Sequence, residues 1–172
     1  MRYANTMLIT ALVTAVFSSA AAHGQGVKPQ DFVTKATVAG KTEVAAARIA
    51  LKNSSADDVK QFARQMIKDH TQAGDELASI AKGKNLQVPA HVDAKHGEVL
   101  AGLRSQSGAA FDASYAKQMV ADHQEAVALF TSEAGDKSDP DLSAFAQKTL
   151  PTLQHHMSMA TSLASAHSPA GQ

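Results

Sequence analysis

Residues 62–70 read FARQMIKDH, and residues 115–123 read YAKQMVADH. Each copy of this repeat has a methionine four residues before a histidine, and an aspartate directly before that histidine. Positions four apart lie on the same face of an α-helix. The repeat therefore predicts two helices that carry the same stripe of Met and His. Whether the two histidines fill a core or bind a ligand depends on what the other helices place beside them.

Residues 1–22 have the features of a secretory signal peptide. Arg2 precedes an apolar run at residues 7–17, and residues 20–22 are alanines suited to cleavage. The apolar run is too short for a stable membrane span, and no later apolar stretch of about 18 residues follows. We therefore expect an exported, periplasmic protein without a transmembrane segment after cleavage. The mature chain would have a flexible leader at 23–29, one domain at 30–166 and a polar tail at 167–172.

Composition excludes several classes of function. The chain has no cysteine, which excludes disulfides, thiolate metal sites and iron–sulfur clusters. It has 16 basic and 16 acidic residues, so charge gives no reason to expect binding to nucleic acid or to an anionic membrane. Neither a phosphate-binding glycine loop nor a nucleophile elbow occurs. No catalytic residue is predicted, and the question of enzyme activity stays open with a leaning against it.

Apolar residues at steps of three and four predict five helices. Four are long, at about residues 31–52, 55–82, 109–133 and 140–166, and a shorter one lies at about 92–103. Ser55 is typical of a helix start, as are Asp139 and Pro140. Only a tight turn fits between the first two helices, so they should form an antiparallel hairpin. The segment with the shorter helix is long enough to cross from one end to the other, which predicts an all-α four-helix bundle.

Each long helix has one strongly polar residue near the middle of its otherwise apolar stripe. Helices of similar length packed side by side place their midpoints in one layer, so these residues should meet inside the bundle. Leaving such groups buried and unpaired costs several kcal/mol, so they must pair with one another or share a cation. Three imidazoles and one carboxylate suit Zn²⁺, Fe²⁺, Mn²⁺ or Cu²⁺. The candidate ligands are Glu43, His70, His123 and His156.

Two further carboxylates lie beside this set. Asp69 and Asp122 each precede a candidate histidine, and they could accept hydrogen bonds from the ligands or add to them. The alternative is a closed network without metal, in which Glu43 accepts hydrogen bonds from the imidazoles. Sequence spacing leaves both interpretations open.

The methionines of the repeat also allow two interpretations. If the second and fourth helices are parallel, Met66 and Met119 share a layer next to the histidines. A pair of thioethers favours Cu(I), whereas methionine facing alanines fills an irregular core. Single exposed histidines are common, and we expect His91, His96 and His155 on the surface.

With these residues in place, the chain resembles the DUF4142 family. The resemblance rests on Glu43, on both copies of the Met-xxx-His repeat, and on the stretch FAQKTLPTLQHH at 145–156. It covers about residues 30–166. It implies a ferritin-like bundle, with a short crossover helix between two hairpins, in an exported bacterial protein. The family carries no established biochemical activity, so the resemblance supplies no reaction.

The chain departs from di-iron ferritin-like proteins at the positions that would bridge two metals. Such proteins place Glu three residues before His on two helices, whereas Ile67, Val120 and Leu153 occupy those positions here. We therefore expect at most one metal ion and no oxygen-activating chemistry. The rival hypothesis is a non-enzymatic envelope protein that acts through its surface, for instance by binding a partner under stress or another copy of itself.

Overall fold

The computed structural model describes residues 27–168, which form five helices and no strand within that range. The helices are α1 (Pro29–Asn53), α2 (Asp57–Gly83), α3 (Ala94–Arg104), α4 (Gly108–Gly135) and α5 (Pro140–Ala166). The all-α fold is therefore confirmed, with helix ends within a few residues of those expected. The predicted signal peptide lies outside the described residues, as do most of the leader and of the tail. None of the described helices combines the length and apolar character that crossing a membrane requires.

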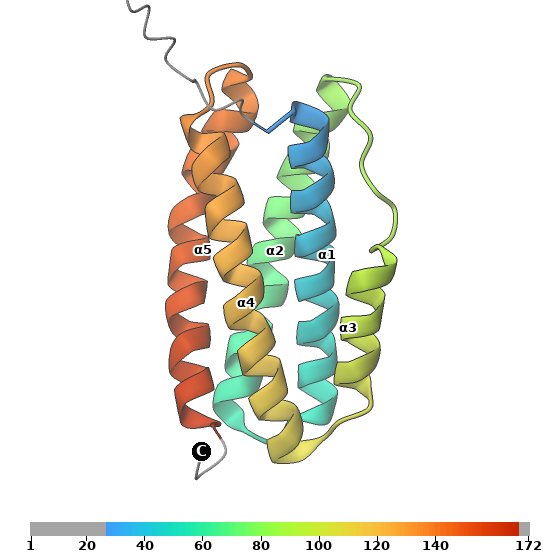
Figure 1. Cartoon of the computed structure of the whole chain (residues 1–172), viewed down its shortest axis with the longest axis vertical. Helices are drawn as coiled ribbons and strands as arrows, with labels where there is room; N and C mark the ends of the chain where they lie inside the picture. Colours follow the sequence, from blue (N-terminus) through green and yellow to red (C-terminus); the bar gives the residue numbers. More distant parts are fainter. Residues whose placement is uncertain (1–26, 169–172) are drawn as a thin grey trace, which may run out of the picture.

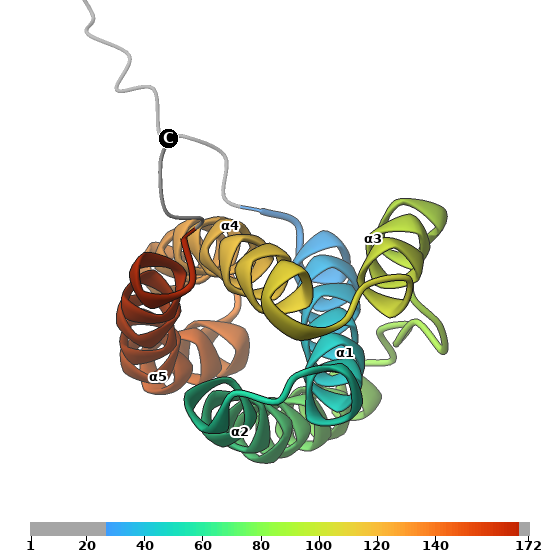
Figure 2. The same cartoon turned by 90° about the horizontal axis from the view of Figure 1, so that it is seen from below.

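The four long helices lie side by side, and α3 lies outside them against α1 (Figure 1). Tight turns join α1 to α2 and α4 to α5, whereas the connection through α3 runs the length of the molecule. As a result α2 and α4 run in the same direction, opposite to α1 and α5. Seen from below, the long helices surround a common axis, with α3 beside α1 (Figure 2). The two copies of the repeat thus lie on parallel helices, as the crossover predicted.

The starts of the helices follow the predicted capping only in part. The Asp139 side chain accepts hydrogen bonds from two backbone N–H groups in the first turn of α5, and Pro140 is its first residue. At α2 the predicted Ser55 cap is wrong. The Ser54 hydroxyl, which is buried in the turn, instead accepts a hydrogen bond of 3.1 Å from the Ala56 N–H. This bond stabilises the turn before α2, whose N-cap residue Ala56 makes no side-chain capping hydrogen bond.

The core consists of two apolar clusters, one toward each end of the bundle. One is rich in aromatic side chains around Phe32, whose ring lies 5.2 Å from that of Phe130. The other contains Phe62 and Tyr115, with ring centroids 6.1 Å apart. On each long helix, the single polar residue of the stripe falls between members of the two clusters. Apolar packing above and below this layer limits its contact with bulk water and strengthens electrostatic interactions within it.

Both methionines of the repeat belong to one of these clusters. Met66 and Met119 are 0% exposed and share their cluster with Ala46, Ala47 and Ala160. Flexible thioether side chains beside small alanines are what an irregular core requires. Their surroundings fit the core-filling interpretation.

A buried carboxylate also lies at the C-terminal end of α4. Glu133 is 2% exposed, and its Oε2 atom has no hydrogen-bond partner. Burial, followed by the charges of Asp136 and Asp139, raises the pKa of Glu133 to about 7. The partial negative charge at the end of a helix acts in the same direction. The fold therefore favours the protonated acid, and ionisation of Glu133 destabilises it.

We expect Glu133→Gln to stabilise the protein at pH 8 and to change little at pH 4. A pKa raised on folding gives a contribution to stability that is fully present below the unfolded pKa of 4.5. It is lost as pH rises through about 7. At about 1.4 kcal/mol per pKa unit, and allowing for solvent screening, the gain at pH 8 should be about 2 kcal/mol. Urea unfolding between pH 4 and pH 8 measures it.

The matched control is Glu125→Gln, which removes an exposed carboxylate from the same helix. Its free energy of unfolding should differ from that of the unchanged protein by a small, constant amount across this pH range. If the change in the free energy of unfolding caused by Glu133→Gln were equally independent of pH, the raised pKa of Glu133 would be contradicted.

Candidate metal centre

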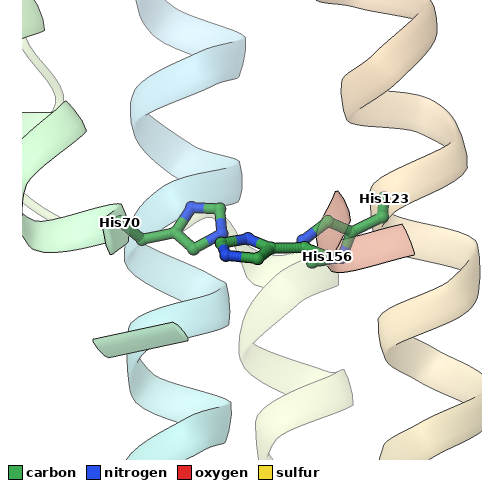
Figure 3. A group of neighbouring side chains, drawn as sticks. All are labelled: His70, His123 and His156. Carbon is green, nitrogen blue, oxygen red and sulfur yellow. The ribbon is translucent and has the colours of Figure 1, made fainter. Parts of the chain in front are cut away.

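Three buried imidazoles converge in the polar layer (Figure 3). His70 comes from α2, His123 from α4 and His156 from α5, and they are 8%, 0% and 1% exposed. Their ring centroids lie 5.3–5.6 Å apart. Each ring offers one nitrogen to a group whose members all lie within 4.8 Å of one another. The structure thus brings together the three histidines that the sequence placed at the middles of their helices.

Each ring is oriented by a different acceptor. The Nδ1 of His123 donates to the backbone carbonyl of Met119 at 2.8 Å. The Nε2 of His156 donates to the Oδ2 of Asp69 at 2.9 Å. The Nδ1 of His70 lies 3.0 Å from the Oε2 of Glu43. Such contacts fix the tautomer and the orientation of an imidazole, and they raise its basicity toward a metal.

The opposite nitrogen of each ring has no partner. His70 Nε2, His123 Nε2 and His156 Nδ1 are buried and make no hydrogen bond. When one nitrogen of a neutral imidazole donates its proton, the other presents a lone pair. When His70 is neutral, as metal binding requires, three lone pairs face buried surroundings without a donor, and each has lost its hydrogen bond to water. A cation placed among them removes this penalty, so these three atoms are the candidate metal ligands.

Glu43 lies beside the histidines but on a different side from these free nitrogens. It is 1% exposed, with its Oε1 atom 3.5 Å from His123 Nδ1 and its Oε2 atom against His70 Nδ1. Both contacts involve the Nδ1 edges, whereas the free nitrogens of these two rings are Nε2. Glu43 was expected as a fourth ligand. In the structure its carboxylate contacts the Nδ1 edges of both rings.

The two aspartates of the repeat have different surroundings. Asp69 accepts hydrogen bonds from His156 and, at 2.6 Å, from Gln65. Asp122 accepts from Gln118 at 2.8 Å, and no hydrogen bond or ion pair among the described residues joins it to the three histidines. Burial raises its pKa to about 6. Asp69 thus lies where the sequence placed an acceptor for a ligand, and Asp122 does not.

Burial and charge set the protonation of the layer. Burial alone would raise the pKa of Glu43, but the surrounding imidazoles, His70 first, outweigh it and hold the pKa below its usual value. Burial alone would lower the pKa of His70, but the Glu43 charge raises it above its usual value. Each group thus favours the charged form of the other, an ionised Glu43 beside a protonated His70, when no cation is present.

The other two rings remain neutral. Burial lowers the pKa of His123 below its usual value, although the Glu43 charge opposes the shift. Burial and then the charge of His70 lower the pKa of His156 to about 4. Neutral imidazole is the form that coordinates a metal. Burial thus keeps His123 and His156 in the form that binds a metal, whereas the Glu43 charge favours the protonated form of His70.

A small polar cavity connects this layer to the surface. It has a volume of about 120 Å³ and lies between α2 and α5, where Asp69, His70 and His156 line it. Glu76 and Lys148 lie at its outer part and form an ion pair of 2.9 Å. An ion therefore has a short polar route to the histidines.

The sequence matches the family described as "Domain of unknown function (DUF4142)" over residues 14–163. The chain belongs to the DUF4142 family. The match confirms the resemblance drawn from the repeat, Glu43 and the stretch at 145–156. No curated protein gives a sequence match.

Two solved structures share the fold of this DUF4142 protein. One is "CopM in the Cu(II)-bound form", with a TM-score of 0.70, 19% identity, and coverage of 83% of this chain and 99% of that one. The other is a DUF305 fragment from Deinococcus radiodurans, with a TM-score of 0.70, 13% identity, and coverage of 82% and 98%. At these identities the likeness shows the fold alone.

Two participants in the site did not emerge from the sequence analysis. One is the backbone carbonyl of Met119, which no side-chain pattern reveals. The other is the pair Gln65 and Gln118, each four residues before an aspartate of the repeat. That spacing places donor and acceptor on one helical face, so the repeat itself carried the signal for the glutamines.

Proposed function

We propose that this protein binds one transition-metal ion through His70, His123 and His156, with Cu(II) as the first candidate. The observation that carries the proposal is the convergence of three buried imidazoles, each of which has one ring nitrogen that makes no hydrogen bond. Imidazole suits copper and zinc, and Cu²⁺ forms the more stable complexes in the divalent series. The Cu(II)-bound form of CopM, which shares the fold, supports testing copper first.

The distances allow an ion to be held after a small adjustment. Metal–nitrogen bonds of about 2.0–2.1 Å bring the nitrogens of a tetrahedral site to about 3.4 Å from one another. One nitrogen of each ring lies within 4.8 Å of those of the other two, so the rings have to approach one another by about 1 Å. Glu43, Met119 and Asp69 would keep holding the far edges of the rings. Three protein ligands leave one coordination position for water or another small ligand.

The proposed role is to hold the ion, with no reaction assigned. Ile67, Val120 and Leu153 occupy the positions of bridging carboxylates, which argues against a di-iron centre even if the bundle is ferritin-like. Export to the periplasm through the signal peptide at residues 1–22 belongs to the same proposal. There the protein would bind copper outside the cytoplasm.

A second candidate is a metal-free envelope protein that acts through its surface. It is favoured by the contact of 3.0 Å between Glu43 and His70, which pairs two of the buried groups without a cation. This candidate predicts that metal has no effect on the melting temperature. It also predicts unchanged partner binding after all three histidines are replaced.

The deciding experiment is elemental analysis of tag-free protein that has met neither chelator nor nickel resin, followed by titration with Cu(II) and Zn(II). We expect one equivalent of metal. We also expect stabilisation by about 2.7 kcal/mol at a free concentration one hundred times Kd. The paramagnetic resonance spectrum of the Cu(II) form should show coupling to nitrogen ligands. The proposal would be excluded if the purified protein contained less than one equivalent of metal, neither Cu(II) nor Zn(II) bound in the titrations, and the melting temperature stayed unchanged.

A further inference from the structure

Helices α2 and α5 lie side by side although they belong to different hairpins (Figure 2). Their line of contact, called the α2–α5 seam below, is bridged by charged pairs from one end to the other. Apart from the contacts of Glu43, every ion pair that joins two helices or their capping residues within the described part of the chain lies on this seam. These pairs are Asp58–His167, Asp69–His156, Glu76–Lys148, Lys84–Asp139 and Lys84–Asp141. Exposed ion pairs contribute little individually, so the seam should cost less to open than the apolar contacts of the core.

Two cavities lie along the seam and share one ion pair. The inner cavity is the small polar one lined by Asp69, His70 and His156. The outer cavity, of about 480 Å³, lies nearer the C-terminal end of α2. Glu76 and Lys148 line both cavities, and the Nζ of Lys148 donates to both carboxylate oxygens of Glu76 at 2.9 Å. This pair, called the entry pair below, therefore lies between the inner cavity and the outer one.

The inner cavity leads to imidazoles that have an unused nitrogen. His70 and His156 line it, and each has one buried ring nitrogen without a hydrogen-bond partner. Its volume of about 120 Å³ corresponds to about four water molecules at about 30 Å³ each, which is enough for a partly hydrated ion. Asp69 adds a carboxylate to its wall, which offsets part of the cost of taking a cation out of water.

A larger cavity beside Gly40 and Gly74, of about 450 Å³, reaches the polar layer at a less suitable place for a cation. A Cβ atom at Gly40 would lie 3.9 Å from His70 Nδ1, so this cavity meets the ring edge that Glu43 already contacts at 3.0 Å. Neither of the other two histidines lines it. Its charged lining residues besides Glu43 are Lys41, Arg48 and Asp75. Two cationic side chains against one exposed carboxylate do not attract a cation, so the seam is the more direct route.

Helix α5 is weakened next to the entry pair. Pro151 lies inside α5, one turn after Lys148. Because proline has no backbone N–H, it cannot donate to the Gln147 carbonyl. The Thr149 hydroxyl donates to the Phe145 carbonyl at 2.8 Å, a contact that often bends helices. A helix that lacks a backbone hydrogen bond is easier to bend at that point, so the seam can open at Lys148 through a local change in α5.

We propose that a divalent transition-metal ion reaches the histidine cluster through the α2–α5 seam, where Glu76 binds it first and the entry pair closes the route between ions. This proposal rests on the metal binding proposed above. The Glu76 side chain is 34% exposed, so an ion can reach its carboxylate from solvent, and the Lys148 side chain, at 67%, can turn out into water. The ion takes the place of the lysine charge on Glu76, and Asp69 is the next carboxylate on its way to the imidazoles.

The first test needs no metal and follows the access of water to His156. In isotope-labelled protein freed of metal by chelator, NMR measures how fast the Nε2–H of His156, which is donated to Asp69, exchanges with water. Lys148→Ala removes the entry pair and should raise this rate about twofold to fivefold, the range expected for loss of an exposed ion pair. The Nδ1–H of His123 should exchange unchanged, because His123 does not line the inner cavity. An unchanged rate for His156, or an N–H that already exchanges too fast to observe before substitution, would overturn closure by the entry pair.

The matched control is Lys68→Ala. Lys68 is an exposed lysine of the same seam-forming helix α2, directly before Asp69, and it lines neither cavity. Its replacement removes the same charge close to the inner cavity and should leave the exchange rate of His156 unchanged. An equal rise in both variants would mean that charge alone sets the rate, which would contradict the proposal.

The second test follows the binding of Cu(II) by stopped flow. Lys148→Ala should raise the association and dissociation rates by the same factor and leave Kd unchanged, because the entry pair can form with and without an ion at the histidines. Glu76→Gln breaks the same pair, so exchange at His156 should rise again. Its Cu(II) association should nevertheless become slower, since the receiving carboxylate is lost while the Lys148 charge remains. Unchanged or faster association with Glu76→Gln would overturn the role of Glu76.

The outcomes separate the route from the binding site. If the unchanged protein binds no Cu(II), the proposed function fails, and proton exchange at His156 still decides whether the entry pair closes the seam. Arg48→Ala removes an exposed charge from the lining of the larger cavity. If that variant binds Cu(II) faster and Lys148→Ala does not, the ion enters beside α1 and the route through the seam is wrong.

Discussion

Replacing His123 with alanine should lower the affinity for Cu(II) by a factor of about one hundred or more. The variant removes one of three nitrogen donors, and loss of even an outer hydrogen-bond partner of a ligand typically costs about 10–100-fold in metal affinity. His123 is the best ligand to remove because its Nδ1 donates to the backbone carbonyl of Met119, one turn earlier on the same helix. The pair formed by Glu43 and His70 therefore stays in place. Competition titration against a chelator of known affinity measures the change.

The matched control is His155→Ala, which removes an exposed imidazole directly beside His156. It should leave copper affinity and stoichiometry unchanged. The circular dichroism spectra of both variants should show the helical content of the unchanged protein, which separates loss of a ligand from loss of the fold. Equal copper affinities for His123→Ala and His155→Ala would mean that the ion binds elsewhere.

Replacing His70 with alanine should destabilise the metal-free protein by about 3 kcal/mol or more. Removal of one partner of a buried ion pair typically costs about 3–5 kcal/mol, because the remaining charge is buried without compensation. Glu43 is 1% exposed, and its nearest charge partner is the His70 ring at 3.0 Å. Urea unfolding at pH 7.5 in the presence of chelator measures the loss.

The companion variant carries Glu43→Gln together with His70→Ala. Because the amide has no charge to leave unpaired, the double variant should recover a substantial part of the stability lost by His70→Ala. The cost of the cavity left by the missing ring remains in both. If the second substitution adds a further loss, the destabilisation comes from the cavity alone and the buried pair contributes little. His155→Ala again provides the exposed control.

The helices and their order could be predicted from local pattern. The repeat at 62–70 and 115–123 marks two helices, and the long connection with α3 makes those helices parallel. The position of the polar layer also followed, because each long helix has one such residue near its middle. Helical period and burial are properties of neighbouring residues in the chain, so a single sequence suffices for them.

The roles within the layer could not be predicted in the same way. The repeat gives Asp69 and Asp122 equal status, yet only Asp69 contacts a histidine of the cluster, across 87 residues of sequence. Glu43 shares the layer with the three histidines, yet it contacts His70 on the ring edge away from the free nitrogen. Helical spacing gives the face on which a side chain lies, and it does not say which edge of a ring meets which neighbour.

The sequence by itself determined an all-helical DUF4142 bundle with one carboxylate and three imidazoles in a common layer. Only the tertiary structure decided that the three rings each bring one nitrogen within 4.8 Å of the others and that Glu43 contacts the Nδ1 edges of His70 and His123. It also decided that a cavity opens beside Gly40 and Gly74. The physical reason is the same in each case. The orientation of a ring and the space beside it depend on contacts between helices, and these contacts exist only once residues distant in the chain have packed together.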